Sequence, residues 1–383
     1  MTGAATYLDH NATTPVDEAV LAAMLPYFRE KFGNASSRHE FGTVARKALD
    51  TAREQVAAAL QVRPTQVIFT SGGSEANNLF LRGAAGYLKP SQIAVSAVEH
   101  PCVAKPAQEL ARRGWTLRKL AVDGEGRLDM ADLDTALAEP TGIVSVMLAN
   151  NETGVIYDVA AVAEKARAKG ALVHSDAVQA FGKIPFDFPS LKVHALTLSG
   201  HKFHAPKGTG VLVVDKKVAL KPQILGGGHE SGLRAGTENV PAIVGLGVAC
   251  ERAAQRVAEA GPRLAALRER LEQGLAGLGA VIFGRGVERL PNTSYFAVPG
   301  IAGETLVIQL DQAGYACASG AACSSGASRV SGVLGAMGVP EELGRGAVRL
   351  SLGRDSTAAQ VDGFLQALAG ALERLRSLAG VAV

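Results

Sequence analysis

The 383-residue sequence has few of the features that mark secreted, membrane or nucleic-acid-binding proteins. Its four cysteines are too few for a disulfide framework, and their spacing fits no structural zinc site, so we expect free thiols and no metal. Because 39 basic residues nearly balance 36 acidic ones, no electrostatic reason favours nucleic acid or a membrane as a direct partner. The first ten residues lack the basic start and apolar stretch of a secretion signal, so we expect a cytoplasmic protein.

The sequence also has no internal repeat, no low-complexity segment and no apolar run long enough to span a bilayer. Residues 312–328 form one long uncharged stretch, but glycine, serine and alanine dominate it, which is typical of a loop. Hydrophobic residues make up 47% of the chain, which indicates a folded protein. The length favours two or more domains.

From about residue 40 to 215, short apolar runs alternate with helical patterns, as between Asp158 and Lys169, where Asp158 is an expected N-cap. Seven runs read as strands: 66–70, 93–97, 115–120, 143–148, 171–174, 196–198 and 210–214. Strands that alternate with helices predict an α/β layer with a mostly parallel sheet.

After residue 240 the pattern changes. Residues 240–278 predict one long helix, with a possible break at Gly261-Pro262. A few strands and a helix over 357–378 follow, which predicts a smaller α+β domain. We therefore expect an N-terminal arm (1–15), a large domain (16–255) and a small C-terminal domain (256–383).

Polar residues follow several of the predicted strands, where ligands of α/β sheets bind. Each has an ordinary explanation when taken alone: Ser71–Glu75 as a turn, Asp176 as an N-cap, and Lys202 as a surface lysine. Together with His100 and the Asn150-Asn151 pair they have a more specific meaning. A phosphate cup, a carboxylate for a ring nitrogen, an imine-forming lysine and a flat imidazole are the parts of a pyridoxal-phosphate site.

The sequence resembles the cysteine desulfurases of the NifS/IscS type, within the class-V aminotransferase-like enzymes. The matching stretches run in family order over nearly the whole chain: YLDHNATTP (7–15), FGNASSRHEFG (32–42), TSGGSEANN (70–78), VEH (98–100), NNETG (150–154), HSDAVQ (174–179), SGHK (199–202), PKGTG (206–210), GGGHESGLRAGTEN (226–239), SGAAC (319–323) and VRLSLGR (348–354). The resemblance implies the pyridoxal-phosphate transferase fold of type I, with a seven-stranded, mostly parallel sheet in the large domain.

The resemblance also implies a role for each matching residue. Lys202 would form the imine with the cofactor, Asp176 would pair with the ring nitrogen, and His100 would stack on the ring and assist proton transfer. Gln179 and Asn151 would contact the ring hydroxyl and the substrate side, and Arg349 would bind the substrate carboxylate. The phosphate would be bound by Gly73, Ser74, Ser199, His201 and, from the neighbouring subunit of a homodimer, Thr237.

Cys323 indicates the reaction. It lies in a run of small residues that offers little packing, so burial explains it poorly, whereas a movable thiolate could take up sulfur and deliver it. Cys317 is interpreted as strand or core, and Cys102 and Cys250, in helical patterns, as structural. The resemblance implies that L-cysteine gives L-alanine and a Cys323 persulfide, which passes to an iron–sulfur scaffold or a tRNA-thiolation protein.

Three other interpretations stay open at this point. A selenocysteine lyase could use the same site, whereas an aminotransferase would need no movable cysteine. A non-catalytic sulfur-relay or scaffold protein would need neither Lys202, Asp176 nor Arg349.

Overall fold

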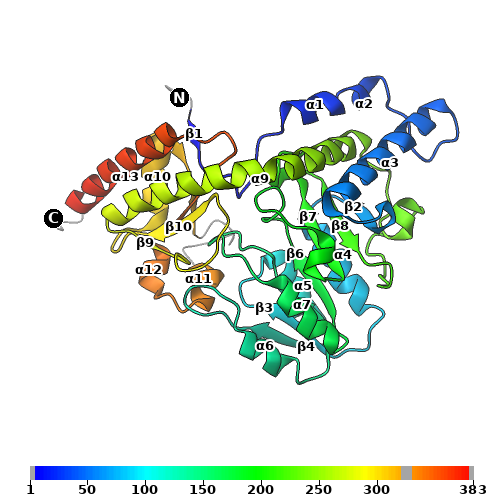
Figure 1. Cartoon of the computed structure of the whole chain (residues 1–383), viewed down its shortest axis with the longest axis horizontal. Coiled ribbons are helices and arrows are strands. Elements are labelled where there is room, and N and C mark those ends of the chain that lie inside the picture. Colours follow the sequence, from blue (N-terminus) through cyan, green and yellow to red (C-terminus); the bar gives the residue numbers. More distant parts are fainter. Residues whose placement is uncertain (1–4, 321–329, 379–383) are drawn as a thin grey trace.

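A computed structural model describes residues 5–320 and 330–378 of the chain. Figure 1 shows two bodies, a large one around a central sheet and a smaller one that carries the C-terminus, with the long helix α9 (Val240–Gly277) running along both. Within the described ranges, no helix is long and apolar enough to cross a membrane.

The large sheet has seven strands in the order β2-β8-β7-β6-β5-β3-β4, and β8 alone runs antiparallel to its neighbours. The prediction of a seven-stranded, mostly parallel sheet is therefore confirmed. The strands are β2 (Val67–Thr70), β3 (Gln92–Ser96), β4 (Thr116–Leu120), β5 (Thr141–Ser145), β6 (Leu172–Asp176), β7 (Ala195–Ser199) and β8 (Gly210–Val214). The helices of this body are α1 (Glu18–Met24), α2 (Pro26–Arg29), α3 (Glu40–Leu60), α4 (Gly73–Ala85), α5 (Pro101–Ala111), α6 (Met130–Ala136), α7 (Val159–Ala168) and α8 (Phe188–Leu191).

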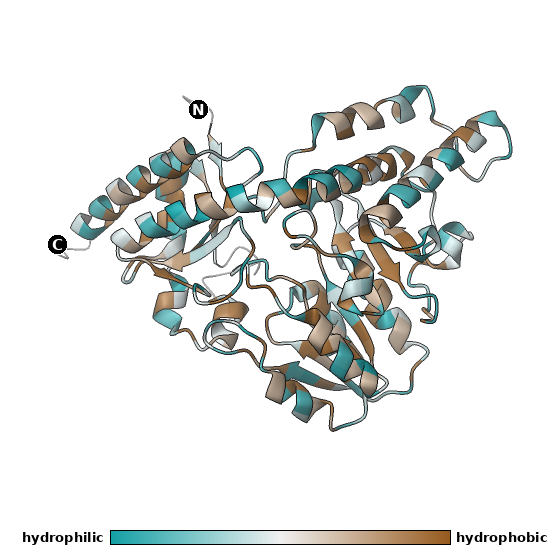
Figure 2. Cartoon of the chain, in the orientation of Figure 1, coloured by the Kyte–Doolittle hydropathy of each residue, from teal (hydrophilic) through white to brown (hydrophobic). Residues whose placement is uncertain are grey.

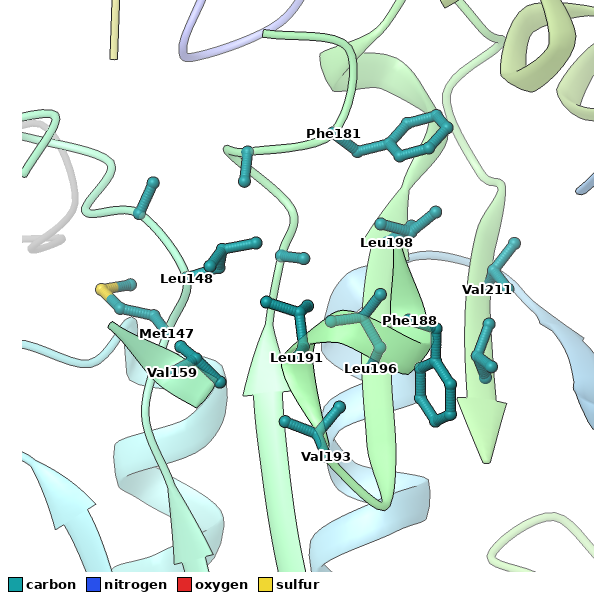
Figure 3. Packing of buried hydrophobic residues seen from close by; sticks show 14 of the residues in the cluster. Met147, Leu148, Val159, Phe181, Phe188, Leu191, Val193, Leu196, Leu198 and Val211 are labelled. Atoms are coloured by element: carbon teal, nitrogen blue, oxygen red, sulfur yellow. The ribbon is translucent and has the colours of Figure 1, made fainter. Parts of the chain in front are cut away.

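Strands β2, β3, β7 and β8 are buried along their whole length, which explains why they read as almost continuous apolar runs, whereas the edge strand β4 has exposed residues. Side chains alternate between faces along a strand, so Ile93 and Val95 pack in one hydrophobic cluster and Ala94 in another. Figure 2 shows the hydrophobic colouring along these strands. Figure 3 shows part of the second cluster, in which Leu196 and Leu198 of β7 lie among residues that include Phe181 and Phe188.

The small body contains a four-stranded antiparallel sheet in the order β12-β13-β10-β9. Its strands are β9 (Val281–Ile282), β10 (Thr293–Ala297), β12 (Ala318–Ser319) and β13 (Ala347–Ser351), and its helices are α10 (Gly303–Gln312), α11 (Gly332–Ala336), α12 (Glu341–Arg345) and α13 (Ala358–Leu378). The antiparallel sheet and its helices agree with the expected α+β architecture.

Helix α9 passes through Gly261-Pro262 without interruption, so the break considered at this point is absent. A proline inside a helix removes one hydrogen bond. Packing offsets that cost, because Leu246 anchors the first half in the core of the large body and Leu271 anchors the second half in that of the small body. The domain boundary at residues 255 and 256 falls inside this helix and stays a prediction.

The N-terminal arm contacts both bodies. Its strand β1 (Thr6–Tyr7) pairs in parallel with β11 (Tyr315–Ala316) of the small body. A few residues later, the backbone N–H of Thr14 donates to the carbonyl of His201 in the large body, at 2.9 Å. The arm therefore crosses the line where the two bodies meet.

Candidate active site

A cavity of about 650 Å³ opens at the carboxyl ends of the central strands, where α/β sheets bind their ligands. Its walls come from three parts of the chain: the large body, the arm and the small body. The predicted site residues that line it are Gly73, Ser74, His100, Asn151, Asp176, Gln179, Ser199, His201, Lys202 and Arg349. Ten residues from separate parts of the sequence thus line one space.

The N-terminus of α4 provides one end of the cavity. Its N-cap, Gly72, offers no side-chain cap, so the first N–H groups of the helix can bind an anion. Gly73 has no room for a side chain, because a Cβ there would lie 2.9 Å from a methyl group of Val178 and 3.3 Å from the Cβ of Ser199. With the hydroxyls of Ser74 and Ser199 beside it, this backbone suits a phosphate group.

Asp176 ends β6 and is buried. One carboxylate oxygen accepts from the N–H of Val178 at 2.9 Å and the other from the side chain of Asn77 at 2.7 Å. Burial raises the pKa of Asp176, while these hydrogen bonds favour its ionised form. A buried carboxylate held in this way can pair with the protonated nitrogen of a heterocycle.

His100 is the N-cap of α5, and its Nδ1 accepts from the backbone N–H of Cys102 at 3.2 Å. The thiol of Cys102 lies 2.8 Å from the same nitrogen. Burial lowers the pKa of His100. Since Nδ1 is an acceptor, the proton of a neutral imidazole is on Nε2.

Lys202 ends a short 3-10 turn directly after β7. Its Nζ donates to the carbonyl oxygens of Asn11 at 2.6 Å and Ala12 at 2.8 Å. Beside it, burial and the positive charges of Lys202 and Lys207 lower the pKa of His201 to about 4, so His201 is neutral near pH 7. The arm therefore holds the amine at the edge of the cavity.

Arg349 reaches the cavity from β13 of the small body. Its guanidinium donates to the carbonyl of Asn151 at 2.9 Å and to the carboxylate of Asp9 at 2.7 Å. Arginine binds carboxylates with two parallel N–H groups, so a cavity that contains this side chain can orient an amino acid.

The two remaining predicted site residues are Thr237 and Cys323. Thr237 is exposed and does not line the cavity, so its assignment to a neighbouring subunit stays a prediction. Cys323 lies outside the described residues.

Sequence reasoning missed several residues of the cavity. Asp9 and Asn11 line it from the arm, where the polar LDHN sequence was the available signal. Cys102, interpreted from the sequence as structural, lines the cavity as well, and its thiol contacts His100. The helical sequence pattern did not indicate the contact with His100, because that contact arises from the position of Cys102 in the first turn of α5, whose N-cap is His100.

These features fit pyridoxal phosphate: an uncapped helix start for a phosphate, a buried carboxylate for a ring nitrogen, an imidazole and a lysine in one cavity. Fold and site together define a pyridoxal-phosphate enzyme of fold type I.

Comparison with known proteins identifies the family. The family model described as aminotransferase class-V matches residues 6–364. The chain is 46% identical to the cysteine desulfurase of Gluconacetobacter diazotrophicus, over 98% of this chain and 95% of the relative. It is 40% identical to the cysteine desulfurase NifS of Azotobacter vinelandii, over 97% and 94% of the two chains. A solved structure called a NifS-like protein superposes with a TM-score of 0.92 at 38% identity, covering 97% of this chain and all of that one. This chain therefore belongs to the class-V aminotransferase family, among its cysteine desulfurases.

Proposed function

We propose that this protein is a pyridoxal-phosphate-dependent cysteine desulfurase that converts L-cysteine into L-alanine and takes up the sulfur on Cys323. The observation that carries this proposal is the convergence of Lys202, Asp176, His100 and Arg349 on one cavity, in a chain closely similar to cysteine desulfurases.

The cofactor, when bound, supplies an electron sink that weakens bonds at Cα and Cβ of an amino acid. Gly73, Ser74, Ser199 and His201 would hold its phosphate, and Thr237 would add a contact from the neighbouring subunit. Asp176 would keep the ring nitrogen protonated.

The remaining site residues handle the substrate. Arg349 binds the carboxylate of L-cysteine and fixes its orientation. Lys202 would hold the cofactor through its amine and could move the proton at Cα, and His100 could donate the proton on its Nε2. The thiolate of Cys323 attacks the substrate sulfur, so that the Cβ–S bond breaks, an S–S bond forms, and Cβ gains a proton to give alanine.

Strand β12, which precedes Cys323 in the sequence, lies beside this cavity. Ala318 of β12 pairs directly with Arg349 of β13, which lines the cavity. Cys323 follows Ala318 five residues later in the sequence, outside the described residues. The segment that carries Cys323 therefore starts beside the proposed carboxylate-binding residue.

The test measures alanine and sulfide released from L-cysteine with a reductant present, for the unmodified protein and for Cys323→Ala. Equal amounts of the two products from the unmodified protein and none from the variant are expected. Normal turnover by the variant would disprove the assigned nucleophile. Release of selenide from selenocysteine without activity on cysteine would favour a lyase instead.

We propose further that the protein is a homodimer with shared sites. Several large apolar side chains are exposed in α1, α2, the position between them, the segment before α3 and the first turn of α3: Leu21, Leu25, Phe28, Phe32 and Phe41. The segment that leads from His229 to Thr237 starts beside the residues before α3, because the hydroxyl of Ser36 is 3.4 Å from His229. A Phe28→Asp variant should sediment as a monomer with weaker cofactor binding, whereas a monomeric unmodified protein would refute the dimer.

We also propose a compartment, an acceptor of the sulfur and a division of the chain into two domains. A reducing compartment keeps the thiol of Cys323 free to take up sulfur, which favours the cytoplasm. The proposed acceptor belongs to iron–sulfur cluster assembly or tRNA thiolation. We retain residues 16–255 and 256–383 as the two domains. Transfer of labelled sulfur from the Cys323 persulfide to a purified scaffold protein would test the acceptor class.

A further inference from the structure

A second lysine is buried next to the proposed site, and the mechanism above does not use it. Lys183 has 9% of its surface exposed, which is unusual for a lysine. Its Nζ makes two hydrogen bonds to described residues, to Oε1 of Gln179 at 2.6 Å and to Oδ1 of Asn11 at 2.7 Å. A buried amine persists where its surroundings give it such partners.

These contacts decide how the side-chain amide of Gln179 is oriented. The Nζ of a lysine presents N–H donors, so the amide must turn its oxygen toward Lys183. On the other side, Nε2 of Gln179 donates to the backbone carbonyl of Asn11 at 3.0 Å. A flipped amide would place an oxygen against that carbonyl and an N–H against the amine, so both contacts select the same orientation.

The fixed amide has one N–H left. Gln179 lines the cavity, so this remaining donor is available to a group inside it. An anionic oxygen is the group that such a donor stabilises most, since hydrogen bonds to charged groups are the stronger ones.

The same lysine also fixes the arm. Asn11 accepts the hydrogen bond from Lys183 at its side-chain oxygen, while its side-chain nitrogen donates to the hydroxyl of Thr293 in the small body, at 2.9 Å. The backbone carbonyl of Asn11 accepts from Lys202 as well. Asn11 therefore links the arm to the small body and to the amine of Lys202, and Lys183 helps to orient it.

The surroundings of Lys183 shift its pKa. Burial, and then the positive charges of Lys202 and Arg349, hold the pKa of Lys183 well below its ordinary value.

We infer that Lys183 is a positioning residue, which fixes the amide of Gln179 so that its remaining N–H meets the ionised ring hydroxyl of the cofactor. This inference rests on the proposed function, because the ring hydroxyl belongs to pyridoxal phosphate. Lys183 itself does not touch the reacting atoms.

The experiment follows the absorbance of the bound cofactor between pH 5 and 9 in the unmodified protein, Lys183→Met, Gln179→Leu and the double variant. Loss of the donor disfavours the ionised ring oxygen, so Lys183→Met should raise the apparent pKa of the chromophore by about one unit. In the Gln179→Leu background, Lys183→Met should add nothing, because its effect passes through the amide. Lys165→Met, which removes an exposed partner of Asp134, serves as the matched control and should titrate normally.

An unchanged chromophore pKa in folded Lys183→Met would overturn the inference, and so would an additive shift in the double variant. Thermal melting shows whether each variant is folded. If Lys183→Met does not fold, Lys183→Gln keeps one donor toward Gln179, and a smaller shift in the same direction is expected. No shift in that variant would likewise overturn the inference. Failure of the proposed function would look different, because the unmodified protein would then release no alanine or sulfide from L-cysteine, while the chromophore titration of the four proteins could still be compared.

Discussion

Replacement of Arg349 by lysine tests how the proposed site recognises its substrate. The guanidinium is buried, with 7% exposed, and its two terminal nitrogens bond to the carbonyl of Asn151 and the carboxylate of Asp9. Its Nε is buried without a hydrogen-bond partner among the described residues. A lysine keeps the positive charge but loses the planar fork.

The size of the effect follows from the hydrogen bonds at stake. One charge-assisted hydrogen bond contributes about 1.5–3 kcal/mol, and each 1.4 kcal/mol is about tenfold in affinity. Arg349→Lys should therefore raise the KM for L-cysteine by roughly 10- to 100-fold and change kcat less, since the charge that orients the substrate persists.

The assay measures initial rates of alanine release over a range of L-cysteine concentrations with a reductant present. Arg345→Lys is the matched control, because that arginine is an exposed residue of α12 paired with Glu341. An unchanged KM in Arg349→Lys, with cofactor absorbance and melting like those of the unmodified protein, would refute the assignment of Arg349 to the substrate carboxylate.

Three further predictions concern stability and cofactor binding. Arg289→Met should lower the free energy of unfolding by about 3–5 kcal/mol in urea titrations, because it leaves Glu272 buried without its partner, and Arg289→Met with Glu272→Leu should recover most of that loss. Burial lowers the pKa of His174 from 6.5 to about 3. Between these two pH values, His174 is therefore protonated in the unfolded chain and neutral in the folded protein. Stability should then fall by about 1.4 kcal/mol per unit as the pH drops from 6.5 toward 3. The slope should be smaller in His174→Gln, and equal slopes would exclude His174 as the cause. Lys202→Ala should lose the yellow absorbance of the bound cofactor, whereas an unchanged spectrum would mean that another lysine binds it.

The local pattern of the chain was sufficient to predict much of the fold. All seven strands of the large sheet coincide with predicted apolar runs, although their ends differ by a few residues. Asp158 caps α7 as expected, with its carboxylate accepting from the N–H of Ala161 at 3.0 Å. Such signals are local: a strand buried on both faces needs apolar residues throughout, and a helix start needs an acceptor.

The polar strand ends were equally readable. Parallel strands carry their carboxyl ends to one edge of the sheet, so Asp176 and Lys202, at the ends of neighbouring strands, had to lie near each other. The alternation of strands and helices thus determined at which edge of the sheet the proposed cofactor site would lie.

The sequence by itself determined the layers, the strand ends and the residue types available there. The tertiary structure decided the partners. Asn11 meets Lys183 across 172 positions, and Arg349 meets Asp9 across 340, distances over which no periodicity carries information. Hydrogen bonds need donor and acceptor within about 3 Å and correctly oriented, and that geometry exists only after the arm has crossed both bodies.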